Sequence, residues 1–282
     1  MSLSGVWRVR FAGSTAILKV GPSPYEAHFY GHVASSLRAA GVPIPILELA
    51  LHEPDRHWLV IEDIPTPLPV ARAEDWQPDP RIIAILAQLH AITRAQPPDI
   101  QEQPDRGWTD AMTQATLSCL RKSDASSLAP LLTRLQIASQ AVFIPWCWIS
   151  GDPNPRNWGL RVDGSPVLFD WELFGPGSPA TDLAIIVPGL GNSTAYHRVA
   201  ATYLAAWDHR EALTWDAANL THQIALAKVA TVVQLLHGHV TGSAHVSADL
   251  LGWLTEAFPS WVTTIHDLTT SASTDGRDGG SS

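Results

Sequence analysis

Three polar side chains in the middle of the chain have the types and spacing needed to hold a metal ion and a phosphate group. Asp152 is followed five residues later by Asn157, and Asp170 comes thirteen residues after that. The intervening runs WGLRV, DGS and PVLF predict a β-hairpin, because a turn signal separates two short apolar segments. A hairpin returns the chain to its start, so we expect two carboxylates and one amide oxygen in one small volume.

Phosphoryl transfer requires such a set. One carboxylate must orient the attacking hydroxyl group and accept its proton, while a second carboxylate and a neutral oxygen hold Mg²⁺ against nucleotide phosphates. A structural explanation competes, since Asp and Asn favour turns and Asp170 could cap a strand end. For each residue alone that explanation is the stronger. The three residues combined with the hairpin favour phosphoryl chemistry.

The elements that must position these residues begin with a small sheet. Alternating apolar residues, turn signals and one helical run predict the order strand, strand, helix, strand, strand, over residues 4–11, 15–20, 25–40, 46–51 and 57–62. Ala12-Gly13-Ser14 and the run EPDR supply the two strand connections, and Gly41 is a plausible end for the helix.

Helices are predicted to dominate the rest of the chain, over residues 80–94, 108–142 with a break near Ala129-Pro130, and most of 180–262. The fold class is therefore α+β. We expect a small N-terminal lobe with an antiparallel sheet (1–64), a proline-rich linker (65–80), a larger mostly helical lobe (81–268) and a disordered polar tail (269–282). A cleft between two such lobes is a natural ligand site.

Composition narrows the function classes. Acidic residues outnumber basic ones, 27 to 18, and the net charge of −9 argues against a nucleic-acid partner. We see no signal peptide and no apolar run of about 18 residues, so we expect no membrane span and a cytoplasmic location. Two cysteines in 282 residues predict reduced thiols rather than a disulfide framework.

The motifs also carry a family resemblance. The sequence resembles the aminoglycoside phosphotransferase and choline kinase-like family over roughly residues 2–260, most sharply in Ser150-Gly151-Asp152-x4-Asn157, Phe169-Asp170-Trp171-Glu172, Gly175-Pro176 and Thr181-Asp182-Leu183-Ala184. The resemblance implies a two-lobed protein-kinase-like fold. It also implies ATP or another nucleoside triphosphate as phosphate donor, Mg²⁺ as cofactor and a small molecule with a hydroxyl group as acceptor.

The resemblance assigns roles within the site. It implies that Asp152 is the catalytic base and that Asn157 and Asp170 bind the metal. Glu172 would approach a second Mg²⁺ or brace the loop, and we favour the metal. Lys19 is similar to the lysine that contacts the nucleotide phosphates, and Glu26 to the glutamate that pairs with it.

Other positions of the family pattern concern the nucleotide and the framework. Glu62, Asp63 and Ile64 resemble the hinge between lobes, where backbone groups bind adenine. Residues 2–5 resemble the end of a phosphate-covering loop, although the usual strand before it is missing. His90 is similar to a packed structural histidine, and Asp182 to a residue that braces the catalytic loop.

One departure from the family pattern leaves an alternative open. Ser150 stands where the family usually has histidine, and we expect its hydroxyl group to make a similar, shorter hydrogen bond. Together with the irregular N-terminus, this keeps open a pseudokinase that binds nucleotide or partners without transfer activity. A helical scaffold with an accidental motif is a third and weaker alternative.

The acceptor is not specified by the motifs. The family implies aminoglycosides, amino alcohols, sugars or related metabolites. We expect the acceptor pocket to involve residues 108–125 and 180–255 of the helical lobe, and the net charge favours a cationic acceptor. The oligomeric state is left open.

Overall fold

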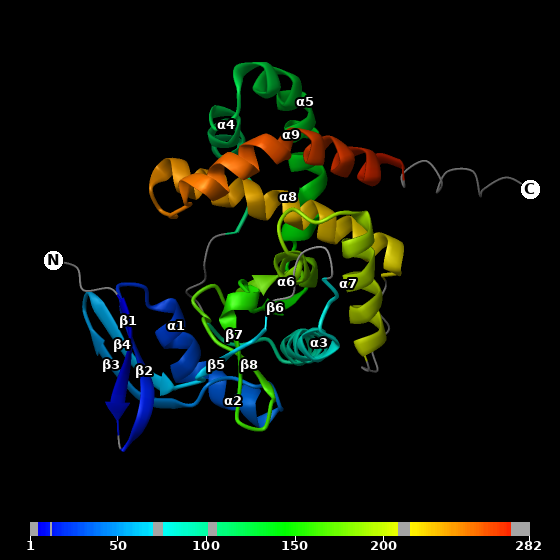
Figure 1. Cartoon of the computed structure of the whole chain (residues 1–282). Helices are drawn as coiled ribbons and strands as arrows, with labels where there is room; N and C mark the ends of the chain where they lie inside the picture. Colours follow the sequence, from blue (N-terminus) through cyan, green and yellow to red (C-terminus); the bar gives the residue numbers. More distant parts are fainter. Residues whose placement is uncertain (1–4, 12, 70–75, 101–105, 208–214, 272–282) are drawn as a thin grey trace, which may run out of the picture.

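The chain forms a small sheet-bearing lobe and a larger helical lobe, as the sequence predicted (Figure 1). The computed structural model describes residues 5–11, 13–69, 76–100, 106–207 and 215–271. In Figure 1 the sheet lies at one side of the molecule, and the helices of the second lobe extend beside and above it.

The N-terminal sheet is antiparallel, with strand order β1-β2-β4-β3. Its strands are β1 (Gly5–Phe11), β2 (Ser14–Gly21), β3 (Leu47–Glu53) and β4 (Arg56–Glu62). Both predicted hairpins are confirmed. The registers pair Val6 with Lys19 and Ile17 with both Arg8 and Ile61. Alternation along β2 therefore places Ile17 and Lys19 on the same face of the sheet, toward one cavity.

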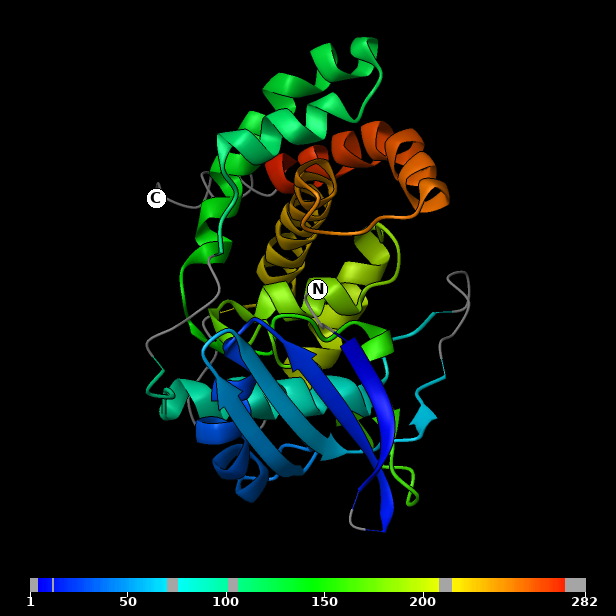
Figure 2. The same ribbon diagram turned by 90° about the vertical axis from the view of Figure 1, so that its left-hand side faces the viewer.

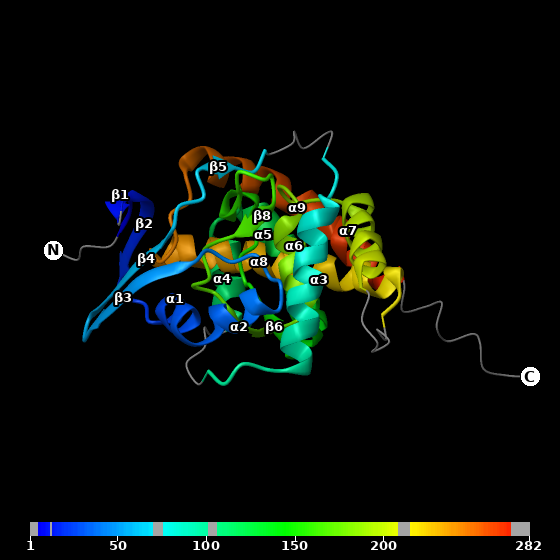
Figure 3. The same cartoon turned by 90° about the horizontal axis from the view of Figure 1, so that it is seen from below.

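A helical segment connects the two hairpins and lies between the sheet and the helical lobe (Figures 1 and 3). It consists of α1 (Tyr25–His28), a π-helical turn (Phe29–Val33) and α2 (Ala34–Ala39). Gly41 ends it with φ of +92°, as expected for a helix C-terminus. The ring of Phe29 stacks on that of Trp171 with centroids 4.3 Å apart, which fixes the segment against the residue that follows Asp170.

Helix α8 (Ala217–Thr241) is the centre of the helical lobe and packs against α4, α5, α6, α7 and α9. The bounds of the remaining helices are α3 (Pro80–Ala95), α4 (Asp110–Ser118), α5 (Lys122–Ser139), α6 (Pro179–Ile186), α7 (Ser193–Ala206) and α9 (Ala248–Ser271). Figure 2 shows α4, α5 and α9 grouped at the end of the molecule farthest from α3. Among the described residues, only α8 is long and apolar enough to cross a membrane, and most of its apolar stretch is buried inside the protein.

Short strands build the region between the lobes. A hairpin of β7 (Trp158–Leu160) and β8 (Pro166–Leu168) forms a sheet with β5 (Thr66–Pro67), and β6 (Cys147–Ile149) pairs with β9 (Gly175–Gly177). Short 3-10 turns span Gln140–Phe143 and Pro155–Asn157. The predicted linker thus begins with a strand, because β5 pairs with β7 of the hairpin.

Two predicted boundaries were wrong. The break expected near Pro130 lies instead at residues 119–121, and α5 continues through the proline. Leu128, Leu132 and Leu135 are buried on one face of α5, and this packing stabilises the helix against the lost backbone hydrogen bond. Helix α9 continues through Ser271, so the first three residues of the predicted tail are helical. Residues 272–282 of that tail lie outside the described residues.

Candidate active site

The predicted hairpin brings Asp170 beside Asn157. Trp158 pairs with Leu168, and the amide of Phe169 donates to the carbonyl of Asn157 at 2.9 Å. Asp170 follows with φ of +70°, the left-handed region that non-glycine residues rarely occupy. The sharp turn ends β8 and turns the Asp170 carboxylate into the space between the lobes, where it lines a cavity.

Asp152 and Asn157 are joined directly. The Asn157 amide nitrogen donates to the Asp152 carbonyl at 2.9 Å and to the Asp152 carboxylate at 3.0 Å. Burial raises the pKa of Asp152, and the negative charge of Asp170 raises it further, against the hydrogen bond from Asn157. A carboxylate with a raised pKa is better suited to accept a proton than an ordinary surface aspartate.

Lys19 connects the sheet lobe to this centre. Its ammonium group lies 2.7 Å from Glu26 Oε1 and 3.0 Å from Asp170 Oδ1. Glu26 also accepts a hydrogen bond from the Trp171 amide at 3.3 Å. Burial opposes the charged form of Lys19, but attraction to Glu26 and Asp170 dominates and raises its pKa. The lysine is therefore a fixed positive charge at the edge of the cleft.

A cavity of about 300 Å³ lies between the lobes at this point. Apolar side chains from both lobes and the polar groups described above line it: Val6, Arg8, Ile17, Lys19, Ile61, Glu62, Asp63, Ile64, Asn157, Phe169 and Asp170. Apolar walls with a few convergent polar groups are typical of sites for small ligands. The predicted hinge residues therefore line the same cavity as Asn157 and Asp170, two of the three predicted metal ligands.

Two ion pairs hold the rim of the cavity. Glu62 accepts two hydrogen bonds from Arg161, at 2.9 and 2.8 Å, which join the end of β4 to the hairpin of the other lobe. Burial opposes this charge, but the Arg161 bonds prevail and lower the pKa of Glu62. Asp63 pairs with Arg8 of β1 at 2.8 Å. The side chains of this hinge therefore have structural partners.

A buried hydrogen-bond network supports the loop that contains Ser150, Gly151 and Asp152. Asp182 is completely buried and accepts hydrogen bonds from the amides of Ser150 and Gly151, both at 2.9 Å. His90 is also buried and lies 3.1 Å from both Asp182 Oδ2 and the Tyr203 hydroxyl group. These contacts confirm that His90 has a structural environment and that Asp182 braces the loop.

Of three further predictions, one is wrong and two are not tested by the described residues. The hydrogen bond expected of the Ser150 hydroxyl group is absent: the side chain is buried, and Oγ has no partner among the described residues. Backbone amides brace this position instead, which serine and histidine supply equally well. Glu172 is exposed and lies outside the cavity lining, so its metal role stays a prediction. Residues 2–4 of the expected phosphate-covering loop lie outside the described residues.

Sequence reasoning missed two residues of the rim, Arg8 and Arg161, and two residues of the cavity wall, Val6 and Ile17. Arg8 and its partner Asp63 are 55 positions apart in the sequence, and Arg161 and its partner Glu62 are 99 positions apart. No local sequence pattern predicts partners at such distances. Ile17 was within reach of the sequence, because it lies two residues before Lys19 in a strand and must share its face.

With the fold and this geometry established, comparison with known proteins gives a family. The sequence pattern of the phosphotransferase enzyme family matches residues 3–220, more than half of the chain. The chain belongs to the phosphotransferase enzyme family. It is accordingly an enzyme of the small-molecule kinase class. A search of the curated proteins gave no match.

Solved structures share the fold of this phosphotransferase at low sequence identity. One is a protein of Ralstonia eutropha JMP134 assigned to the aminoglycoside phosphotransferases, with 13% identity, a TM-score of 0.64, and 96% of this chain and 91% of that chain covered. A spectinomycin phosphotransferase in complex with ADP and spectinomycin has 11% identity, a TM-score of 0.60, and 95% and 91% covered. A microcompartment-associated aminopropanol kinase has 17% identity, a TM-score of 0.59, and 98% and 91% covered. The likenesses support the two-lobed kinase-like fold.

The donor groups of this phosphotransferase fit a magnesium ion that also binds nucleotide phosphates. The amide nitrogen of Asn157 is committed to Asp152, so its oxygen is free to face the cavity, where the Asp170 carboxylate also lies. Carboxylate and amide oxygens are hard ligands of the kind that Mg²⁺ prefers. The described residues contain no cluster of three His, Cys, Asp or Glu side chains, so phosphate and water would complete the coordination.

Proposed function

We propose that this phosphotransferase moves the γ-phosphoryl group of ATP, or of another nucleoside triphosphate, to a hydroxyl group of a small molecule in the cytoplasm. The bond between the acceptor oxygen and the γ-phosphorus forms as the bond from that phosphorus to the bridging oxygen breaks. The acceptor's proton passes to Asp152, and a nucleoside diphosphate leaves. The observation that carries this proposal is the convergence of Lys19, Asn157 and Asp170 on one cavity, with Asp152 bonded to Asn157.

Each side chain has a defined task in this proposal. Lys19, held by Glu26, binds the phosphates, and backbone groups at Glu62–Ile64 bind the base. Asn157 and Asp170 would hold Mg²⁺, which neutralises the charge that develops on the transferred group. Asp152 orients the acceptor hydroxyl group, and its raised pKa favours proton acceptance as the oxygen attacks.

We propose the acceptor class from the family, which implies amino sugars, amino alcohols or sugars as acceptors. A second, more open cavity of about 490 Å³ lies within the region where we expected the acceptor, lined in part by Pro188, Leu190, Arg198 and Trp253. Arg198 is the one charged side chain in its described lining. This lining gives no support to the acidic pocket that the net charge suggested, so a cationic acceptor stays a prediction.

The proposal is tested by measuring nucleoside diphosphate release with MgATP and MgGTP across a panel of amino sugars, amino alcohols and simple sugars. We expect MgATP to raise the melting temperature and at least one acceptor to stimulate turnover. Asp152→Asn should reduce kcat by about a hundredfold or more, whereas Asp163→Asn, on an exposed hairpin turn, should not. Stabilisation by MgATP with no turnover on any acceptor would instead support the pseudokinase.

A further inference from the structure

The link between the catalytic loop and the metal-binding segment is not made by Ser150. Its buried hydroxyl group has no partner among the described residues, and only its backbone amide is used, by Asp182. Nevertheless, Asp152 and Asp170 must keep a fixed relative position if one takes the proton and the other holds the metal. Backbone pairing of Ile149 with Gly175 already joins these two segments. A side chain between the loop that carries Asp152 and the turn that follows Asp170 would fix their separation further.

Arg106 occupies that place. It lies in the connection between α3 and α4, and its Nη2 donates to the carbonyl of Leu173, 67 residues away in the sequence. Gly151 packs against the same two groups: a Cβ atom added to it would overlap both the Leu173 carbonyl and the Arg106 guanidinium. Gly151 also has φ of +85°, so both its conformation and its surroundings require glycine. The guanidinium thus lies where the two segments meet.

The electrostatic surroundings of Arg106 are unusual. Its Nε atom is buried without a hydrogen-bond partner among the described residues. Burial lowers the pKa of Arg106, and the nearby carboxylate of Asp182 opposes this effect. A desolvated cation is costly unless a negative group compensates it. Asp182 is that group, and it is the residue that holds the amides of Ser150 and Gly151.

We propose that Arg106 is a positioning residue for phosphoryl transfer. Its guanidinium braces Gly151 and the Leu173 carbonyl against each other and supports the charge of Asp182. Asp152, which follows Gly151, and Asp170, which precedes Leu173 by three residues, thereby keep the separation that the reaction needs. The inference rests on the proposed function for its activity readout, and Arg106 itself lies outside every motif used to recognise the site.

The test compares Arg106→Ala with Arg134→Ala, a matched change at an exposed arginine of α5 that lies outside the site and outside the segments expected to bind the acceptor. For Arg106→Ala we expect kcat to fall about 10–100-fold while the KM for nucleotide changes much less, because misplacement of reacting groups reduces rate more than binding. Millimolar guanidinium chloride should restore part of the lost kcat. Equal concentrations of sodium chloride or neutral urea should not.

Several outcomes would overturn the inference. Equal kcat values for Arg106→Ala and wild type would do so, as would a lost kcat that guanidinium does not restore. If Arg106→Ala fails to fold, Arg106→Lys is measured instead; we expect a lower kcat at a similar melting temperature, and unchanged kcat would refute the role. If wild type itself neither binds MgATP nor turns over, the proposed function has failed, a result separate from any difference between variants.

Discussion

The substitution Asp182→Asn tests whether the buried network below the catalytic loop stabilises the protein. The side chain is completely buried, and its two oxygens accept from the amides of Ser150 and Gly151 and from the His90 ring. Asparagine has the same shape but replaces one acceptor oxygen by an NH₂ donor. In the less costly orientation, this NH₂ group faces the Gly151 amide, and two donors then lie against each other without an acceptor.

The magnitude follows from these contacts. One buried amide left without an acceptor costs about 1–3 kcal/mol, and the remaining two bonds lose the added strength of a charged acceptor, about 1 kcal/mol together. We therefore expect Asp182→Asn to reduce the free energy of unfolding by about 2–4 kcal/mol. Urea denaturation followed by tryptophan fluorescence measures this quantity directly, since several of the twelve tryptophans are buried in the core.

A matched control isolates the effect of burial. Asp163→Asn makes the same chemical change on the exposed turn of the hairpin, where Asp163 accepts from the Ser165 amide at 2.9 Å. An asparagine can form the same local turn there, so we expect little change in stability. If Asp182→Asn is no more destabilising than Asp163→Asn, the network does not hold the loop and our reasoning about its brace is wrong.

Two further predictions concern charges in the two lobes. In thermal-shift assays, Asp170→Ala should remove the Mg²⁺-dependent part of the stabilisation of the protein by nucleotide. Lys19→Met should instead weaken nucleotide binding with or without Mg²⁺. Equal Mg²⁺ dependence in wild type and Asp170→Ala would contradict the metal assignment. Lys228 of α8 donates to the carbonyls of Ala184 and Val187 at the end of α6, and burial lowers its pKa from 10.5 to about 8. The folded protein therefore binds this proton less tightly than the unfolded chain. As pH rises from about 7.5 to 9.5, the free energy of unfolding of wild type should increase by about 2 kcal/mol relative to that of Lys228→Met. If urea denaturation gives the same difference between the two proteins at both pH values, the prediction is wrong.

Local sequence signals were sufficient to predict most of the fold and the approach of Asp170 to Asn157. Alternation and turn residues predicted both N-terminal hairpins, and a turn signal between two apolar runs predicted the return of Asp170 to Asn157. In each case the two partners belong to one hairpin, so the pattern that specifies the contact is visible in a single stretch of sequence. The same reasoning failed at Pro130, where burial of one face of α5 outweighs a local helix-breaking signal.

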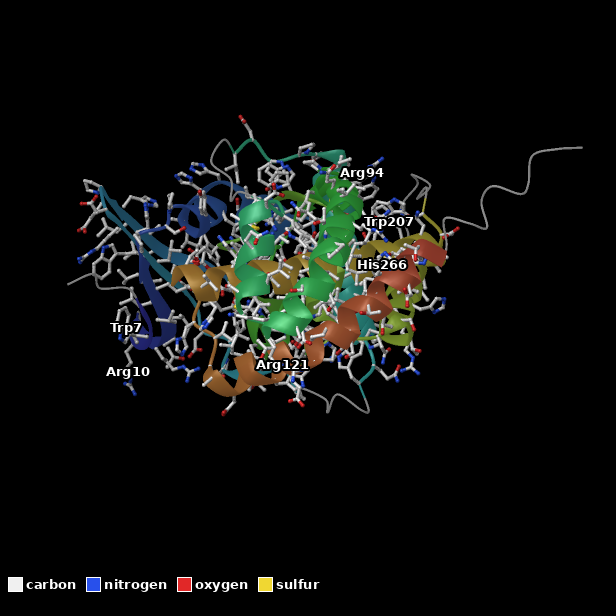
Figure 4. The ribbon with its side chains drawn as sticks, turned by 90° about the horizontal axis from the view of Figure 1, so that it is seen from above. Trp7, Arg10, Arg94, Arg121, Trp207 and His266 are labelled. Carbon is white, nitrogen blue, oxygen red and sulfur yellow. The ribbon has the colours of Figure 1, made fainter. Side chains whose placement is uncertain are left out.

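Contacts between distant segments could not be predicted, because no short stretch of sequence contains both partners. Arg106 is an unremarkable residue of a polar connection until the fold places it against Gly151 and Leu173. The cluster of Trp146, Trp207 and Arg94 is similar: the guanidinium lies 3.9 Å over the Trp146 ring, and Figure 4 shows Arg94 and Trp207 at the end of the molecule opposite β1. No spacing along the chain relates these residues.

The ion pair between Lys19 and Asp170 depends on the packing of the two lobes against each other. These residues are 151 positions apart and belong to different lobes, so their 3.0 Å separation exists only when the lobes are packed together. The stack of Phe29 on Trp171 and the bond from the Trp171 amide to Glu26 lie beside this ion pair and join the same two segments. Glu26 thus binds Lys19 and the residue after Asp170 at once. Packing at this junction therefore sets the geometry of the proposed site, because any change that shifts α1 moves Lys19 relative to Asp170.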